Sequence, residues 1–119
     1  MKSITIWHNP RCSKSRAAFE LLSESGLEFE TYKYLIEEPT IQDIETVLSK
    51  LNMDDPREMM RTKEDIYVEL GLKDESDRSK LISAMVQNPK LIERPIVVTD
   101  DGAAIGRPLE NISNLLGID

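Results

Sequence analysis

The spacing of hydrophobic residues predicts a strand, a helix and a second strand at the start of the chain. Residues 3–6 alternate between polar and apolar side chains, which is the period of a strand. Past the turn signal Asn9-Pro10, apolar residues recur at helical spacing, with Ser13 as the expected N-cap and Gly26 ending the helix. The aromatic-rich, alternating segment 27–34 predicts the second strand. Because a helix connects the strands, they are expected to be parallel.

The middle of the chain predicts helices only. Thr40 and Asp43 have the spacing of a capping box, and apolar residues follow at helical intervals. Pro56 is expected as the first residue of the next helical segment. The segment 57–70 predicts two helical pieces, and the segment from about 77 to 87 predicts a further helix.

The last third returns to strands. Residues 96–99 form a β-branched run, a turn follows at 100–102, and residues 103–106 lead back, which predicts a hairpin. Arg107-Pro108 then opens a final helix. This order predicts an α/β protein with a thioredoxin-like fold, in which a helical block is inserted into a mixed parallel and antiparallel sheet of about four strands. We expect a single domain over residues 1–119.

Composition narrows the classes of function. The chain has 119 residues, 39% of them hydrophobic and 31% charged, which is typical of a globular protein. Its single cysteine excludes an internal disulfide, and one cysteine with one histidine makes a metal site unexpected. No apolar run has the length of a membrane span, and no signal peptide is expected, so the expected compartment is the cytoplasm. A net charge of −7 argues against nucleic-acid binding.

The charge is distributed unevenly around the one thiol. No acidic residue precedes Glu20, whereas four basic residues do, namely Lys2, Arg11, Lys14 and Arg16. Cys12 falls at the predicted N-terminus of a helix, where free N–H groups and the helix dipole favour an anion. The pKa of a cysteine in such a place drops from about 8.5 to roughly 3.5–7.5. These observations favour a reactive thiolate that meets a small anion over the alternative, a buried structural cysteine.

Other polar residues stand where chemistry is expected. His8 is separated from Cys12 by the turn and is expected to fold back as an imidazolium that stabilises the thiolate. Ser15 is a possible donor to the thiolate, although serine in a first helical turn is also common for capping. Arginine binds two oxygens of an oxyanion at once. Arg94 and Arg107 are therefore candidate oxyanion ligands, because each lies between glycine or proline and a segment expected in the core. Arg61 is equally compatible with this role and with a surface position.

Four motifs occur along the chain, namely His8-Asn9-Pro10-x-Cys12-x-x-Ser15-Arg16, Met60-Arg61-x-Lys63 followed by Glu69-Leu70-Gly71-Leu72, Arg94-Pro95-Ile96-Val97-Val98 and Gly106-Arg107-Pro108. In order and spacing they resemble the glutaredoxin-linked arsenate reductases, the ArsC family of thioredoxin-like oxidoreductases. The segments around Cys12 and Arg61 resemble most the YfgD-type branch of that family.

The resemblance implies a role for each matched residue. Cys12 is implied as the nucleophile that forms an adduct with arsenate, and His8 and Ser15 as the residues that keep it ionised. The implied oxyanion ligands are Arg61, Arg94 and Arg107. Pro95 matches a proline that is usually cis in such folds.

The resemblance also implies the source of electrons. Reduction of arsenate takes two electrons, which one cysteine cannot supply while also regenerating itself. No bound cofactor is expected, so glutathione is implied as co-substrate and glutaredoxin as the partner that resolves the mixed disulfide.

Two alternatives stay open. One is a thiol-dependent oxidoreductase that acts on another oxyanion or on an activated sulfur. The other is a non-enzymatic regulator similar to the Spx-type proteins, which bind RNA polymerase. Those proteins typically carry a CxxC pair, and here Asn9 stands in place of its first cysteine.

Overall fold

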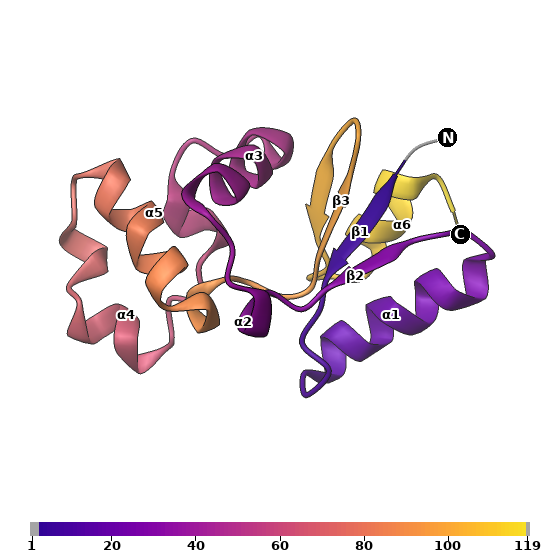
Figure 1. Ribbon diagram of the computed structural model, residues 1–119, viewed down its shortest axis with the longest axis horizontal. Coiled ribbons are helices and arrows are strands. Elements are labelled where there is room, and N and C mark those ends of the chain that lie inside the picture. The colour runs from indigo at the N-terminus through magenta and orange to yellow at the C-terminus, as the bar shows by residue number, and fades with distance from the viewer. Residues whose placement is uncertain (1–2, 119) are drawn as a thin grey trace. The chain divides into compact units, whose positions relative to one another are not determined.

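The computed structural model describes residues 3–118, so Lys2 lies outside the described residues (Figure 1). The chain divides into two compact units. The first contains the described residues up to Glu37 and those from Arg94 onward, and the second is Glu38–Glu93. The second unit coincides with the helical block that the sequence predicts as an insertion. The assignment of residues 1–119 to a single domain stays a prediction.

The first unit is built on a four-stranded sheet. Its strands are β1 (Ile4–Trp7), β2 (Glu30–Tyr32), β3 (Ile96–Thr99) and β4 (Ala103–Ile105), in the order β2-β1-β3-β4. β1 and β2 run parallel, whereas β3 is antiparallel to both β1 and β4. The mixed sheet, the parallel pair and the hairpin are therefore confirmed.

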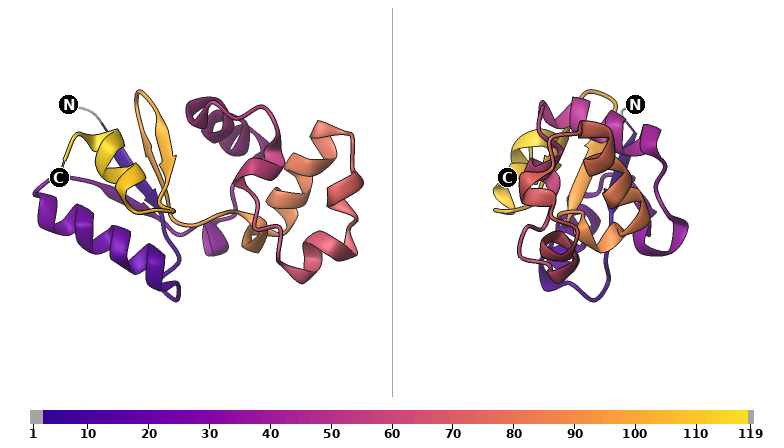
Figure 2. Two further views of the ribbon diagram at one scale, coloured as in Figure 1. Left: turned by 180° about the vertical axis from the view of Figure 1, so that it is seen from behind. Right: turned by 90° about the vertical axis from the view of Figure 1, so that its left-hand side faces the viewer.

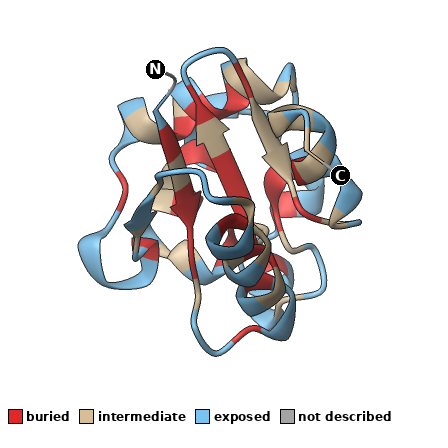
Figure 3. Ribbon diagram, turned by 90° about the vertical axis from the view of Figure 1, so that its right-hand side faces the viewer, coloured by how far each residue is buried: buried red, intermediate tan, exposed pale blue. Residues whose placement is uncertain are grey.

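Two helices cover one face of this sheet, α1 (Ser13–Ser25) and α6 (Glu110–Leu116) (Figures 1 and 2). The register places Ile6 opposite Val97, so both side chains point to the same face. There they form a buried cluster with residues from both helices, Ala18, Leu22 and Ile112 among them. Figure 3 shows the buried residues gathered in the middle of the sheet.

The second predicted strand is shorter than expected. The alternating pattern predicts a strand over 27–34, but β2 covers only Glu30–Tyr32. Its pairing partner β1 ends at Trp7, and the last paired residues are Trp7 and Tyr32. The short helix α2 (Tyr34–Glu37) begins directly afterwards, with the Glu37 carboxylate accepting a hydrogen bond of 3.1 Å from the Lys33 N–H. Tertiary pairing and this local bond thus override the strand propensity of the segment.

The second unit contains helices α3 (Ile41–Leu51), α4 (Asp65–Glu69) and α5 (Arg78–Gln87), and the short 3₁₀ helices η1 (Pro56–Met59), η2 (Leu72–Asp74) and η3 (Pro89–Leu91). The predicted capping box is present, because Thr40 Oγ1 accepts from the Asp43 N–H at 3.1 Å and the Asp43 carboxylate accepts from the Thr40 N–H at 2.9 Å. Helices α3 and α5 pack together over a buried core that includes Ile44, Leu48 and Met85.

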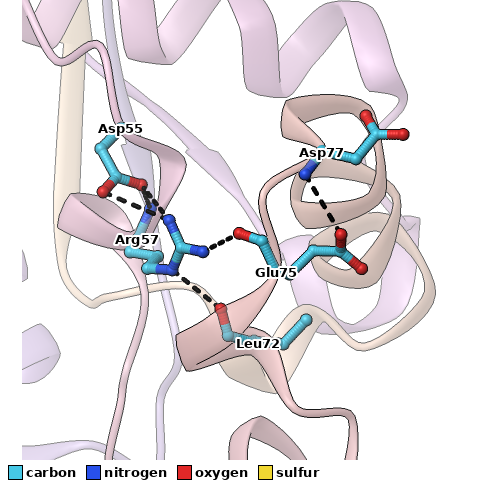
Figure 4. A network of polar contacts seen from close by, with 5 residues as sticks. All are labelled: Asp55, Arg57, Leu72, Glu75 and Asp77. Carbon is cyan, nitrogen blue, oxygen red and sulfur yellow. Dashed lines mark hydrogen bonds and ion pairs between the residues drawn. The ribbon is translucent and has the colours of Figure 1, made fainter.

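One arginine joins the irregular segments of this unit (Figure 4). Arg57 Nε donates to the Leu72 carbonyl at 2.8 Å, and an Nη group donates to the Glu75 carbonyl. The same guanidinium pairs with Asp55 at 3.2 Å. One side chain therefore bonds two backbone carbonyls, one at the start of η2 and one directly after it. None of the helices within residues 3–118 combines the length and apolar character needed to cross a membrane.

Candidate active site

Cys12 is itself the N-cap of α1, in extended backbone conformation. Its carbonyl accepts the first helical hydrogen bond from the Arg16 N–H at 2.9 Å, and its own N–H donates to the Asn9 carbonyl at 3.0 Å. The expectation that Ser13 is the N-cap is therefore wrong by one residue, because the Asn9–Cys12 turn closes before the helix begins at Ser13. This turn directs the thiol towards the free N–H groups of the first helical turn, and Cys12 is only 9% exposed.

Opposing effects act on the Cys12 thiol. Burial is the largest and raises its pKa, since a thiolate loses hydration there. The backbone N–H of Ser15, a hydrogen bond from Arg94, the backbone N–H of Lys14 and the charge of Arg94 all lower the pKa. Together they outweigh burial, and the pKa of Cys12 lies below its ordinary value. The thiolate is the nucleophilic form of cysteine, so the arrangement favours reactivity.

Two arginines from the segments before β3 and after β4 reach this thiol. Arg107 Nη2 lies 4.0 Å from Cys12 Sγ, and Arg107 Nε donates to the Arg94 carbonyl at 2.8 Å. The Arg94 Nε is buried and has no hydrogen-bond partner among residues 3–118. An orphaned buried donor beside a thiolate is suited to an added anion. Both arginines precede cis peptide bonds, Arg94–Pro95 and Arg107–Pro108.

Gly106 permits the close approach of the segment after β4 that carries Arg107. A Cβ atom at this position would lie 2.6 Å from Ile112 Cδ1 and 2.8 Å from Pro95 Cγ. The Gly106 N–H donates to the Pro95 carbonyl at 2.8 Å, which joins the two segments that bear the arginines. The absence of a side chain thus fixes the distance between β4 and α6.

His8 and Ser15 form a buried polar pair behind the thiol. His8 Nδ1 lies 2.7 Å from Ser15 Oγ, which also accepts from the Asn9 N–H at 3.0 Å. The His8 ring stacks on Phe19 with centroids 5.1 Å apart. Burial, then the charges of Lys33 and Arg16, lower the pKa of His8 below 6.5. Cations and apolar groups around the ring therefore favour its neutral form, against the imidazolium that the sequence predicts.

Arg61 belongs to the second unit, where its backbone and side chain are both bonded. Its N–H donates to the Leu91 carbonyl at 2.6 Å, and its Nη1 pairs with Glu64 Oε1 at 2.6 Å. Five of the six candidate residues thus lie in the first unit and Arg61 in the second. The role of Arg61 as an oxyanion ligand stays a prediction.

Residues 7–115 match the ArsC family. The chain belongs to the ArsC family.

Relatives within this family match along nearly the whole chain. YfgD of Escherichia coli K12 is 49% identical over 117 residues, covering 98% of each chain. A protein named arsenate reductase from Neisseria meningitidis serogroup B is 48% identical over 98% of this chain and 100% of its own. The solved structure of an arsenate reductase from Vibrio cholerae superposes with a TM-score of 0.89 at 41% identity, covering 98% of each chain.

These similarities confirm the ArsC resemblance and the thioredoxin-like fold of the sheet unit with its inserted helices. They also confirm the kinship with YfgD. The roles of the individual residues in the four motifs stay predictions.

One contributor to the site was missed by sequence reasoning. Lys33 follows β2 directly, at the same end of the sheet as His8, and its charge lowers the pKa of His8. The signal was available in principle, because residues that follow parallel neighbouring strands meet at one sheet edge. The predicted strand extended to residue 34, however, so Lys33 was assigned to the strand and not to the segment that follows it.

Proposed function

We propose that this ArsC protein is an oxidoreductase that reduces arsenate to arsenite through an adduct on Cys12. The observation that carries the proposal is the position of the Cys12 thiol, whose pKa is lowered, at the N-terminus of α1 beside Arg107 and Arg94. The Nε of Arg94 is buried and has no hydrogen-bond partner among residues 3–118. Relatives from Neisseria and Vibrio bear the name arsenate reductase, which supports the choice of oxyanion.

The residues divide the chemistry between them. The Cys12 sulfur attacks arsenic and displaces one oxygen as water, so that a sulfur–arsenic bond replaces an arsenic–oxygen bond. Arg94 and Arg107 hold the remaining negative oxygens with charge-assisted hydrogen bonds. Neutral His8 and Ser15 position the first turn of α1 and its N–H groups. Arg61 is proposed as the third ligand of the oxyanion.

The electron balance requires a second thiol. In the next step, a glutathione thiol attacks the adduct, Cys12 and glutathione together lose two electrons, and arsenic(V) leaves as arsenic(III) in arsenite. The product on the protein is a Cys12–glutathione disulfide. The chain has no other cysteine to open that disulfide, so we propose glutaredoxin as the thiol donor that does. The mechanism needs reduced glutathione, which keeps thiols reduced in the cytoplasm, and we therefore propose that the protein acts there.

The decisive experiment follows arsenate-dependent oxidation of NADPH in the presence of glutathione, glutaredoxin and glutathione reductase. We expect turnover with the natural protein and none with Cys12→Ser. Omission of glutathione or replacement of glutaredoxin by thioredoxin should also stop it. Sustained turnover without glutathione would contradict the mechanism.

Two further measurements distinguish a wrong substrate from an unreactive thiol. If Cys12 alkylates rapidly at neutral pH but arsenate is not turned over, arsenate is the wrong oxyanion while the activated thiol stands. For Arg61, the variant Arg61→Gln should raise the KM for arsenate and leave the alkylation rate of Cys12 unchanged. Lys63→Gln, which removes a positive charge two residues away, is its control.

A further inference from the structure

The first unit is polarised by charge. Its basic residues within the described range all lie at the end of the sheet that carries Cys12, on the segments that follow β1, β2 and β4 or precede β3; they are Arg11, Lys14, Arg16, Lys33, Arg94 and Arg107. At the other end, acidic residues lie near the start of β2 and at the turn between β3 and β4, namely Glu28, Glu30, Asp100 and Asp101. Two acidic residues, Glu37 and Glu110, follow β2 and β4 at the Cys12 end, where they are outnumbered by the basic residues. Although the whole chain has a net charge of −7, the end of the sheet that carries Cys12 is where an anion is attracted.

The basic residues are not equally engaged. Arg94 and Arg107 act on the thiolate, and Arg16 Nη1 donates to the Pro10 carbonyl at 3.0 Å. Arg11 and Lys14 differ from these. Both are exposed, and neither side chain makes a hydrogen bond or ion pair with any residue in the range 3–118. The two residues flank Cys12 closely in sequence, so two uncommitted cations border the thiol.

We propose that Arg11 and Lys14 bind the carboxylates of an anionic small thiol when its sulfur attacks at Cys12. This inference rests on the proposed function, which requires such a thiol, and it assigns residues that select it. The ligand class is a thiol flanked by carboxylates, as in glutathione. Arg94 and Arg107, by contrast, serve the oxyanion. Selection by exposed charges acts mainly on the rate of encounter and is screened by salt.

The test uses no arsenic, so its outcome does not depend on the arsenate reaction. Cys12 is first converted to a mixed disulfide with dithiodipyridine. An added thiolate then attacks the Cys12 sulfur, and a new sulfur–sulfur bond forms as the old one breaks. The pyridinethiolate leaves with the electron pair, takes a proton from water and is followed by the absorbance of thiopyridone. Glutathione is compared with its diethyl ester, which has the same thiol without the carboxylate charges. Both thiols are also allowed to react with a small reference compound, the thiopyridine disulfide of N-acetylcysteine amide. For each thiol, the rate with the protein is divided by the rate with this compound, which removes differences in intrinsic thiol reactivity.

We expect glutathione to react about tenfold faster than the diester at low salt. The double variant Arg11→Gln/Lys14→Gln should reduce that preference to about threefold or less, as should about 1 M salt. The control Ser23→Asp/Asn114→Asp lowers the net charge by the same two units at exposed positions near the C-terminal ends of α1 and α6, away from Cys12, and should keep the preference. An absent preference in the natural protein, or one that survives the double variant, would overturn the proposal.

Discussion

At the scale of single residues, Cys12 is controlled by hydrogen bonding that acts against burial. Arg94 contributes both a hydrogen bond and a charge that lower the pKa of the thiol, whereas exposed Arg11 contributes neither. We therefore predict that Arg94→Gln raises the pKa of Cys12, so that less thiolate is present at a given pH. The rate of alkylation by iodoacetamide, measured across pH, should have its midpoint displaced to higher pH. The control Arg11→Gln removes the same charge from the residue directly before Cys12. An equal displacement of the midpoint in that variant would contradict the role assigned to Arg94.

Ser15 and Ser13 offer a matched pair of serines in the first turn of α1. Ser15 is fully buried, and its hydroxyl is bonded to both His8 Nδ1 and the Asn9 N–H. Ser15→Ala would leave the buried His8 Nδ1 and the partly buried Asn9 N–H without this partner, and we predict a loss of about 1–3 kcal/mol in the free energy of unfolding. Ser13→Ala should cost almost nothing, because Ser13 is exposed and is not the N-cap. Urea denaturation measures both; a loss at Ser13 of about 1 kcal/mol, typical of a cap, would restore the sequence-based assignment.

The candidate site shows which single-residue features a sequence can carry. Residue type and order located Cys12, His8, Ser15, Arg94 and Arg107, since a helix N-terminus and glycine–proline corners are local features. The direction in which the pKa of His8 shifts could not be predicted from the local sequence. It depends on burial and on Lys33, which comes from a different strand, and neither is encoded in the spacing of the motif.

At the scale of elements, the corner between β4 and α6 depends on the absence of a side chain at Gly106. We predict that Gly106→Ala destabilises the protein by about 1–3 kcal/mol, because the new Cβ would meet Ile112 Cδ1 at 2.6 Å and Pro95 Cγ at 2.8 Å. The second substitution Ile112→Val removes that Cδ1 atom. Thermal unfolding of both single variants and the double variant should show partial recovery in the double variant. Simple additivity of the two losses would contradict a direct clash.

Elements were predicted well where one periodic pattern and its caps agree. The apolar period and the Thr40–Asp43 box predicted α3, and the apolar period over about 77–87 predicted α5, which covers Arg78–Gln87. Prediction failed where tertiary pairing sets the length. β2 pairs with β1 over only three residues, and the segment around it continues into α2 instead. The short 3₁₀ helices have too few residues for a period to be visible.

At the scale of the whole molecule, the ionisation of the one histidine links the site to stability. In the folded protein, the pKa of His8 is below 6.5, while in the unfolded chain it takes its ordinary value. The unfolded state therefore binds the proton first as the pH falls. The contribution of neutral His8 is fully present above about pH 6.5 and is lost as the pH falls towards the folded pKa. Cys12 has a lowered pKa as well, so its thiolate adds stability in the same direction at higher pH.

We predict that the free energy of unfolding falls between about pH 7 and pH 5.5, by at most about 1.4 kcal/mol per pH unit for one proton. The measurement is urea denaturation across this range in the Cys12→Ser background, which removes the titration of the thiol. His8→Asn in that background retains a polar group beside Ser15 but has no proton to gain, and its stability should be nearly constant over the same range. If both proteins lose stability in parallel as the pH falls, the dependence comes from carboxylates rather than from His8, and the assignment of a buried neutral ring is wrong.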